Sequence, residues 1–473
     1  MLESGAHGRK LEDFEPTRKH INAAIQEAGD TIDARLRWAY NNIPLYGGAA
    51  DQWASSAIVD GIKPMPIIKG YDSERDALIK RWWRWVDEAD YYGRSSFYGL
   101  QQLIAREVFL MGECFVILRS IKPTTSYVDL PFRLEVLPKE MLDVHYDAPA
   151  KIEGHYIRMG IEFDANDQCV AYHFFTRHPA DYTPFTQKNR HQTYVRVDAV
   201  DVIHVCENRD AGQLRGLSRA TRSLIKFFEL NCYDEAELDR KRASALFAFF
   251  FTGRGELPVD PNERNKNKAR AHLPDTITGG AALDLGDDKD VKFSTPTDVG
   301  GNYGEFQYQN LLKICAGLNM PYALVTGDVT RGNFSNARTA LGQFRRLIRQ
   351  WREEIIGYQL NRLVWRRFVE MSVLYSKVHL PHFDEDPYQW FDILNFGPQL
   401  EMIDPLKDIM AEKLEIASGL KTLTMALNER GYDAKTVLQD RADELAFLNT
   451  LGLKFSDDGS SVIQDEKSDE DDE

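Results

Sequence analysis

Two histidines and three carboxylates gather in one short segment of the chain, and these residue types can bind divalent metal ions. They are His379, His382, Asp384, Glu385 and Asp386. A cation held there could activate water for a hydrolytic reaction. Metal ligands bind tightly only inside an organised shell of supporting side chains, and this segment around Pro381 shows none. We therefore interpret it as a solvated loop and predict no metal and no cofactor.

The motifs of common enzyme classes are missing from the sequence. A P-loop requires G-x-x-x-x-G-K-[ST], and the nearest fragment, Gly327–Gly332, has no Lys-Ser/Thr after it. The sequence also lacks H-E-x-x-H and G-x-S-x-G. The five cysteines are scattered without a C-x-x-C pair, which indicates buried free thiols rather than a zinc site or a disulfide framework. We predict that the chain is not an enzyme.

Arginine and tryptophan side chains could instead contact nucleic acid. Arginines recur between the apolar positions of the segment 336–377, and Trp82, Trp83 and Trp85 lie close together. Arginine neutralises phosphate charge, and tryptophan stacks on bases. The same arginines could form a solvated or inter-subunit face that pairs with acidic side chains, and the tryptophans a contact between helices. We favour this second interpretation for both groups.

The length and charge of the chain limit its class. With 473 residues it is too long for one compact core, so we expect about two to four structural units. Its 73 acidic residues exceed its 58 Lys and Arg residues, which gives a net charge of −15. An acidic surface either serves solubility or lets DNA pass without holding it. No signal peptide and no apolar run of the ~20 residues that span a bilayer is recognised, so we expect a soluble protein made in a cytoplasm.

The apolar periodicity predicts an α+β fold in which helices flank a β-rich insert. Helices are expected over 72–89, 95–111, 217–251, 303–317, 336–377 and within 404–453, where Asp404 is the expected N-cap. Strands are expected at Glu113–Arg119, Arg133–Val136, Met141–Tyr146, Tyr156–Phe163, Cys169–Phe175, Tyr194–Val197 and Asp201–Val205, and near 289–295. Ala243–Phe251 could finish a helix or begin a strand. The helix over 336–377 would be roughly 60 Å long, so it must cross a large assembly, be kinked or consist of two helices.

Four stretches, in the same order, resemble the lambda-type portal proteins of tailed bacteriophages. They are His204–Gly216, Tyr233–Leu238, Asn333–Leu341 and a C-terminal group made of Asp404–Lys407, Ala417–Leu423 and Glu429–Asp433. In the family, the first marks the passage from a β-rich insert to a stem helix, and the third opens the long helix with an aromatic-Ser-Ser-Ala-Arg signature. Residues 1–35 match poorly, since the family often has a longer arginine-rich segment there.

The resemblance implies a portal fold with a wing, stem helices, a β-rich clip, a long kinked helix and a helical crown. The implied parts are a flexible N-terminal arm (1–20), wing and first stem helix (21–129), clip (130–206), second stem helix (207–251), wing (252–324), tunnel loop (325–335), long helix with its wing and crown connection (336–399), crown (400–455) and acidic disordered tail (456–473). In this layout the tunnel loop would face the DNA channel. Its DNA-facing residues would be Thr330, Arg331, Gly332, Asn333 and Ser335.

The same resemblance implies a ring, commonly of twelve copies, that forms the DNA channel at one capsid vertex for packaging and ejection. The ring would dock the large terminase subunit and later head-tail connector proteins, and it would contact the major capsid and scaffold proteins. Double-stranded DNA would pass without sequence preference, and no membrane would be involved. The protein would reside at the portal vertex of the virion after assembly in the host cytoplasm. Two alternatives stay open: a metal-dependent nuclease or hydrolase, and a capsid scaffolding or adaptor protein.

Overall fold

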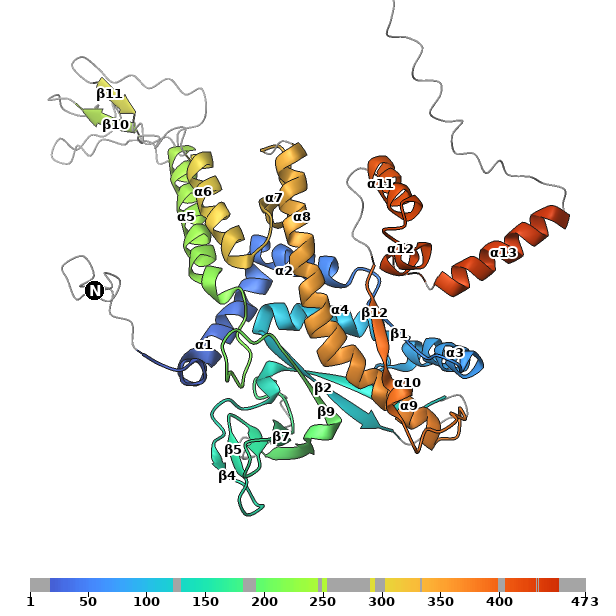
Figure 1. The fold of residues 1–473 in the computed structure, drawn as a ribbon. Coiled ribbons are helices and arrows are strands. Elements are labelled where there is room, and N and C mark those ends of the chain that lie inside the picture. The colour runs from blue at the N-terminus through green and yellow to red at the C-terminus, as the bar shows by residue number, and fades with distance from the viewer. Residues whose placement is uncertain are drawn as a thin grey trace, which may run out of the picture. The chain divides into compact units, whose positions relative to one another are not determined.

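The computed structural model describes residues 18–121, 129–181, 193–245, 249–252, 290–293, 303–331, 334–398, 405–430, 432 and 434–450. The predicted acidic tail, 456–473, and most of the predicted N-terminal arm lie outside them. The chain forms two compact units. The larger comprises Met1–Thr221 and Asn319–Glu473, and the smaller comprises Arg222–Leu318. Helices and strands occur in both, so the predicted α+β class is confirmed (Figure 1).

Helices make up the N-terminal part of the larger unit: α1 (Ile21–Asn42), α2 (Pro44–Ile58), α3 (Asp72–Glu88) and α4 (Phe97–Met111). α4 begins where the Ser96 hydroxyl accepts a hydrogen bond from the backbone N–H of Gly99 at 3.3 Å. It ends at Gly112, whose φ of +84° is left-handed, and a Cβ there would lie 2.3 Å from the Leu217 nitrogen. Only glycine fits this position, which brings Glu113, the next residue, against the segment around Leu217.

Aromatic side chains join the two helices that were expected before the first strand and are confirmed as α3 and α4. Trp82 and Trp85 of α3 are buried, with ring centroids 5.2 and 5.7 Å from that of Phe97 in α4. Aromatic pairs at such separations add stability beyond the area that they bury. For Trp82 and Trp85 the interpretation as a helix contact is therefore confirmed, whereas Trp83 is 45% exposed.

Two antiparallel sheets of the larger unit share one apolar core. The first has the order β3-β2-β9, with β2 (Glu113–Ser120), β3 (Phe132–Pro138) and β9 (Val202–Cys206). The second has the order β4-β5-β6-β7-β8, with β4 (Ala148–Pro149), β5 (Tyr156–Arg158), β6 (Ile161–Phe163), β7 (Cys169–Phe175) and β8 (Tyr194–Asp198). Phe115 and Ile117 of β2 belong to the same buried cluster as Ile161, Tyr172 and Phe174 of the second sheet. The β-rich insert is thus anchored to β2.

One predicted strand of the insert is wrong. Residues Met141–Tyr146 form no strand, and a 3₁₀-helix, η2 (Lys139–Met141), precedes a turn there. Leu142 makes only an isolated antiparallel bridge with Phe174, and its carbonyl accepts a hydrogen bond from Arg215 at 2.9 Å. The chain then turns, with the Tyr146 N–H donating to the Asp143 carbonyl, so pairing does not continue as a strand. The predicted strand Tyr156–Phe163 is the hairpin β5–β6, because two residues with positive φ turn the chain between them.

The longest helix runs through three segments. α8 (Phe334–Trp351) continues into a π-helical stretch, η4 (Arg352–Asn361), and then into α9 (Arg362–Leu374). Figure 1 shows these segments as one continuous orange coil. The helix predicted over 336–377 is confirmed, and its irregularity takes the form of a π-helix within an unbroken run. Hydrogen bonds in a π-helix link residues five apart, and such segments are a common cause of helix bending.

Short elements and a helical end complete the larger unit. They are β1 (Lys63–Pro66), η3 (Ala199–Asp201), α7 (Tyr322–Thr326), α10 (Tyr388–Phe391), β12 (Ile393–Phe396), α11 (Pro405–Ala417), α12 (Leu423–Glu429) and α13 (Ala434–Thr450). β1 and β12 pair antiparallel and so connect the N-terminal helices with the chain after α9. The helices expected within 404–453 are confirmed as α11 to α13, while Asp404, their expected N-cap, lies outside the described residues.

The smaller unit pairs two helices. They are α5 (Thr221–Ala245) and α6 (Tyr303–Leu318), and the chain between them contains β10 (Phe249–Thr252) and β11 (Asp290–Phe293), which pair antiparallel. Ser223 near the start of α5 donates to the carbonyl of Ile314 near the end of α6, at 3.1 Å. Tyr303 at the other end donates to Asp234 at 2.9 Å. The helices are therefore antiparallel and side by side (Figure 1), and the ambiguous run before residue 252 ends as a strand.

The structure also bears on the membrane and cysteine expectations. Within the described ranges, no helix is both apolar and long enough to cross a bilayer. Cys114, Cys206 and Cys315 are buried, as expected. Cys169 and Cys232 are exposed, so the expectation of buried thiols is wrong for these two. Cys169 is the first residue of β7 and Cys232 lies on the exposed side of α5, positions where packing does not cover the side chain.

Candidate functional site

The loop between α7 and α8 contains residues predicted to face DNA. α7 ends at Gly327, which is left-handed with a φ of 72°. Asp328 follows, and its carboxylate accepts hydrogen bonds from the backbone N–H and the hydroxyl of Thr330, at 2.9 and 2.6 Å. These bonds hold the pKa of Asp328 below its usual value, so it stays ionised. The first part of the loop is therefore a hydrogen-bonded turn that leads into Arg331.

The structure describes only part of the predicted DNA-facing set. Thr330 and Arg331 are both exposed. Gly332 and Asn333 lie outside the described residues. Ser335 belongs to the first turn of α8, but its side chain lies outside the described set. The two described residues are thus accessible to a ligand of the loop, and the role in DNA contact stays a prediction for all five.

α8 presents two chemically different sides. Phe344, Ile348 and Trp351 are buried, and the rings of Phe344 and Trp351 lie edge-on to Trp53 of α2, with centroids 5.8 and 6.1 Å away. This packing fixes which side of α8 remains outside. That side carries four arginines, which we name the arginine face: Arg338, Arg345, Arg346 and Arg349. Arg345 is half-buried and the other three are exposed.

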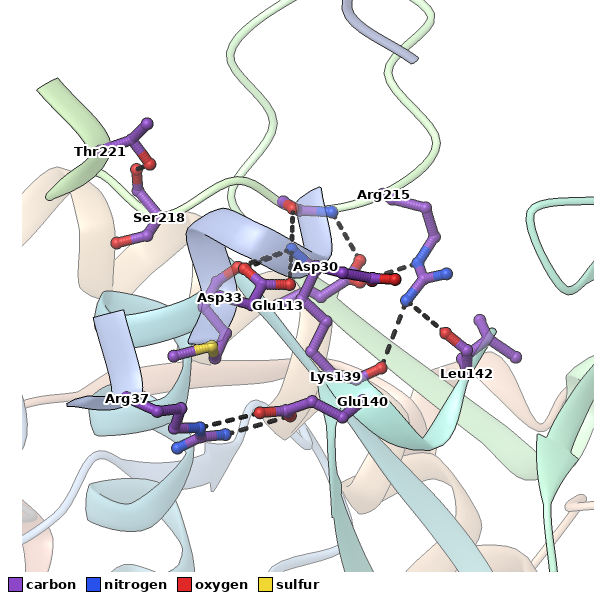
Figure 2. A network of polar contacts seen from close by, with 12 residues as sticks. Asp30, Asp33, Arg37, Glu113, Lys139, Glu140, Leu142, Arg215, Ser218 and Thr221 are labelled. Carbon is purple, nitrogen blue, oxygen red and sulfur yellow. Dashed lines mark hydrogen bonds and ion pairs between the residues drawn. The ribbon is translucent and has the colours of Figure 1, made fainter. Parts of the chain in front are cut away.

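A second candidate site is a buried network of charged side chains at the start of β2 (Figure 2). Glu113 is fully buried, and Arg215, which is 1% exposed, donates from Nε to one of its carboxylate oxygens at 2.8 Å. The other oxygen accepts from the Gly216 N–H at 2.6 Å and lies 2.8 Å from His204 Nε2. The remaining nitrogens of Arg215 donate to three backbone carbonyls. Both charges are thus paired and hydrogen-bonded, as burial requires.

Further ion pairs tie α1 to this network. Lys139 lies 2.8 Å from Asp33 of α1 and also donates to the Gly216 carbonyl at 2.9 Å. Arg37 of α1 contacts two carboxylates, those of Glu107 at 2.6 Å and Glu140 at 2.9 Å. Figure 2 shows the contact with Glu140. The network therefore joins α1, the end of α4, β2 and the segment that carries Arg215. No residue of it was predicted as functional from the sequence.

The two buried acids of this network titrate in opposite directions. Burial would raise the pKa of Glu113, but the charge of Arg215 and the contacts with His204 outweigh burial and lower it to about 2. Burial raises the pKa of Asp33 to about 6, because the opposing effect of Lys139 is smaller. Perturbed pKa values occur at catalytic sites and also in structural ion pairs. Both carboxylate oxygens of Glu113 accept hydrogen bonds, which indicates that this network is structural and not catalytic.

Three residues of this region come close enough together to be considered as metal ligands. Glu113, His204 and Cys206 place one ligand atom each within 4.8 Å of one another, the one such group in the described part of the chain. Both oxygens of Glu113, however, already accept hydrogen bonds, one of them from the cationic guanidinium of Arg215. Burial also raises the pKa of the Cys206 thiol well above its usual value, which disfavours the thiolate that binds metals. The group does not fit a metal site.

The histidine and carboxylate segment after Pro381 lies at the surface. His379, His382 and the three acidic residues up to Asp386 are all exposed. His382 Nδ1 lies 3.0 Å from Glu385, with both side chains more than half exposed. These contacts agree with the interpretation as a solvated loop.

Comparison with known proteins gives a consistent result. The model of the family described as "Phage portal protein, lambda family" matches residues 7–352. A curated relative, the "Probable portal protein" of Halomonas phage phiHAP-1, is 22% identical over 330 residues, which make up 68% of this chain and 61% of the relative. The chain thus spans about three fifths of that relative's length.

Solved structures of similar fold come from gene transfer agent (GTA) particles. A chain in the neck of an empty GTA particle, computed with C6 symmetry, has a TM-score of 0.47 at 13% identity, with 89% of this chain and 94% of that chain covered. A chain in the neck of the native particle, computed with C12 symmetry, has a TM-score of 0.44 at 13% identity, with 84% and 91% covered.

Proposed function

The chain belongs to the lambda family of phage portal proteins, and on this premise we propose that its copies close into a ring around the DNA channel at one capsid vertex. This family is structural and not enzymatic, which removes the alternative of a nuclease or hydrolase. The proposed ring has twelve copies and passes double-stranded DNA during packaging and ejection. It docks the terminase motor first and head-tail connector proteins afterwards, and the capsid and scaffold proteins surround it.

One observation carries the proposal of a ring. Of the described residues of α11 to α13, only Ala426 and Ala434 are buried. Eleven large apolar residues of this end are exposed: Leu406, Ile409, Met410, Leu414, Leu420, Leu423, Met425, Tyr432, Leu438, Leu445 and Phe447. Helices of one chain are stable mainly when an apolar face is covered. The C-terminal helices therefore need a surface that the described part of this chain does not supply.

A second copy of the chain is the occupant that we propose for this apolar surface. Closed rings form when one patch of a subunit fits a different patch of the next. α11 shows a suitable patch, since Leu406, Ile409, Met410 and Leu414 follow the helical spacing of three and four residues and are all exposed. Large exposed apolar patches mark protein interfaces in soluble proteins. In a ring, each copy would cover the α11 patch of the copy next to it.

The division of the chain into two compact units supports an assignment of stem and clip that differs from the one predicted from the sequence. We propose α5 and α6 as the stem pair and the chain between them as the tip that docks partners. The first stem helix predicted near 95–111 is α4, and its residues Phe97, Gln101 and Ile104 are buried in the larger unit. The clip predicted for 130–206 shares a core with β2. Both belong to the packed core of the larger unit, so we favour the helical pair of the smaller unit as the stem.

Imaging of the purified protein tests the ring. Class averages viewed along the symmetry axis should show a closed particle with a central opening, and mass photometry should give one species of about twelve times the chain mass. Monodisperse monomers at every salt and protein concentration would contradict the proposal. A ring of another copy number would keep the proposal and correct its stoichiometry.

The loop before α8 gives a prediction about DNA retention. Exchanging Arg331 for glutamate reverses an exposed charge without touching the packed side of α8, so rings should form normally. Near a DNA backbone the new carboxylate repels phosphate, and we expect particles to retain less than half of the normal genome content. Genome content is measured by quantitative PCR of nuclease-treated particles. Arg158→Glu, an exposed position on β5, is the matched control, and equal genome content in both variants would contradict the assigned role.

A further inference from the structure

β1 and β12 form a small sheet (Figure 1), and an apolar groove lies beside it. Met65 of β1 pairs with Leu394 of β12, so their side chains share one face of the sheet. Ile67, Phe396 and Ile79 of α3 line the same groove, which has a volume of about 180 Å³. Ile67 and Leu394 are 43% and 48% exposed. We name these five residues the sheet patch.

The sheet offers a partner its face and not the outer edge of β1. The Ile67 N–H donates to the Asp392 carbonyl, so the backbone groups of Pro64 and Pro66, at alternate positions, point away from β12. Proline has no N–H, so a further strand finds no donor along this edge. Both proline side chains are buried, on the face opposite to Met65. A partner is therefore expected to pack side chains on the sheet patch.

The α11 patch has a similar length. It consists of Leu406, Ile409, Met410 and Leu414. At about 1.5 Å per residue, the helix from 406 to 414 is roughly 12 Å long. From position 63 to position 67, the chain of β1 spans roughly 13 Å at about 3.3 Å per residue. Lys413 lies on the same side of α11 as the patch, because it follows Ile409 by four positions and Met410 by three. It is exposed and forms no ion pair with any residue that the structure describes.

An acidic side chain borders the sheet patch. Asp60 and Phe396 line a second cavity, of about 300 Å³, so this acid lies near one end of the patch. The Asp60 side chain is 64% exposed, and its ion pair with Lys63 is long, at 3.8 Å. The carboxylate is thus open to a cation that approaches from outside. Lys413 is such a cation, and it lies among the apolar residues of α11 just as Asp60 lies beside those of the sheet.

We propose that the α11 patch of one copy packs on the sheet patch of the next copy, with Lys413 placed against Asp60. The inference rests on the proposed ring and names the second patch that a ring contact needs, since a closed ring joins two different surfaces of the same subunit. Both patches remove apolar surface from water in this contact, which is the main favourable contribution to association. The pair of opposite charges fixes which end of α11 lies at the Phe396 end of the sheet.

The chain's own α11 and an unrelated protein are the alternative occupants of the sheet patch. The chain's own α11 follows β12 after residues 397–404, yet both patches are exposed in the structure of the single chain. An unrelated protein would cover one patch and leave the other open. A second copy is favoured because the same subunit carries both surfaces, with opposite charges beside them. Every copy of a ring then covers one patch of its neighbour and has its own other patch covered.

Charge reversal in the full protein tests the contact. Lys413→Glu and Asp60→Lys should each lower the fraction of chains in rings about fivefold, as measured by mass photometry at a protein concentration where half of the natural chains are assembled. The double variant, which again places opposite charges together, should recover at least half of the lost rings. Lys377→Glu and Asp87→Lys change exposed charges outside both patches and should leave assembly unchanged. Circular dichroism checks that every variant folds.

Cysteine cross-linking tests the orientation of the contact. In the proposed orientation, Leu406 lies at the Ile67 end of the sheet patch of the next copy. The test chain carries Leu406→Cys and Ile67→Cys, and its natural exposed cysteines are replaced (Cys169→Ser and Cys232→Ser). Mild oxidation should give a ladder of covalent multimers in a non-reducing gel. Leu374→Cys in place of Ile67→Cys puts an exposed cysteine outside the patch and should give almost no ladder.

The outcomes separate this inference from the proposed ring. Restored rings in the double charge variant, together with a ladder, support it. If the natural chain forms rings, but the charge reversals and the cysteine pair behave like their controls, the α11 patch packs elsewhere, which overturns the inference and leaves the ring standing. A cross-link that forms only within single chains would show that the chain's own α11 covers the sheet patch, which also overturns it. If the natural chain forms no rings at any concentration, the proposed ring fails and the inference fails with it.

Discussion

Replacing Arg215 with methionine should lower the free energy of unfolding by about 3–5 kcal/mol, the range measured when one partner of a buried ion pair is removed. The size of the effect comes from Glu113, which is 0% exposed and would keep its negative charge without its cation. Three backbone carbonyls would lose their donor as well. We expect this variant to be mostly insoluble at 37 °C and to unfold at a much lower urea concentration than the natural protein.

Two control variants show whether the loss comes from the uncompensated charge. Lys19→Met removes the cation of an exposed pair with Glu27, and such pairs contribute about 0–1 kcal/mol. The double variant Glu113→Met with Arg215→Met removes both buried charges and should recover part of the lost stability. A single Arg215→Met variant as stable as Lys19→Met would contradict the assigned role of the pair.

The pH dependence of stability gives an independent readout of the same pair. The pKa of Glu113 is about 2 in the folded protein against 4.5 for an ordinary glutamate, so it contributes on the order of 3 kcal/mol above pH 4.5. That contribution is lost as the pH falls toward 2. Without Arg215 the folded-state pKa rises, so the stability gap between variant and natural protein should narrow between pH 7 and pH 4. Asp33, whose pKa is raised to about 6, loses its contribution as pH rises through 6, but it does so in both proteins.

The sequence predicted helices and strands well where the pattern is local. α3, α4 and β7 follow from apolar spacing within each segment, and their bounds agree with expectation to within a residue or two. The long helix was also predicted, because Phe344, Ile348 and Trp351 repeat at helical spacing. Its π-helical middle was not, since that geometry depends on what packs around Arg352 and Asn361, such as the carbonyls of α2.

The buried charge network could not be predicted from local patterns. Glu113 and Arg215 are 102 positions apart, and each looks like an ordinary surface residue in its own segment. One signal was present: each stands next to a glycine, Gly112 and Gly216. A Cβ on Gly216 would lie 2.5 Å from the Gly112 carbonyl carbon, so the two backbones touch only because both residues lack a side chain. A glycine beside a charged residue in each of two distant segments is thus a useful search pattern.

The DNA-facing residues of the loop before α8 could not be predicted from local sequence patterns either. The resemblance to the portal family led to Thr330, Arg331, Gly332, Asn333 and Ser335, and no spacing rule would have selected them. The sequence does show six arginines and no acidic residue between Val329 and Arg352. Which side of α8 is packed, however, is known only from the contacts of Phe344 and Trp351 with Trp53.

Introducing a charge into the apolar face of α11 should prevent ring formation while each chain still folds. In the single chain Leu414 is 72% exposed, so a glutamate there costs little folding energy. In contact with a neighbouring copy, the glutamate would be buried without a partner, which costs several kcal/mol at every interface of the ring. Loss of the buried leucine side chain would cost a further ~2 kcal/mol. We expect Leu414→Glu with Leu406→Glu to shift the protein from rings to monomers and dimers, as measured by mass photometry.

A leucine of equal exposure supplies the control for this variant. Leu374 at the end of α9 is also 72% exposed, so Leu374→Glu repeats the change made at Leu414 in a side chain of equal exposure. Circular dichroism and the unfolding temperature should be unchanged in both variants, and rings should disappear only when α11 is altered. Rings that survive charges at positions 406 and 414 would mean that this face is covered by something other than the neighbouring copy. Because a closed ring has as many interfaces as subunits, even a modest loss at each one is multiplied around the circle, so the oligomeric state is a sensitive measure of this face.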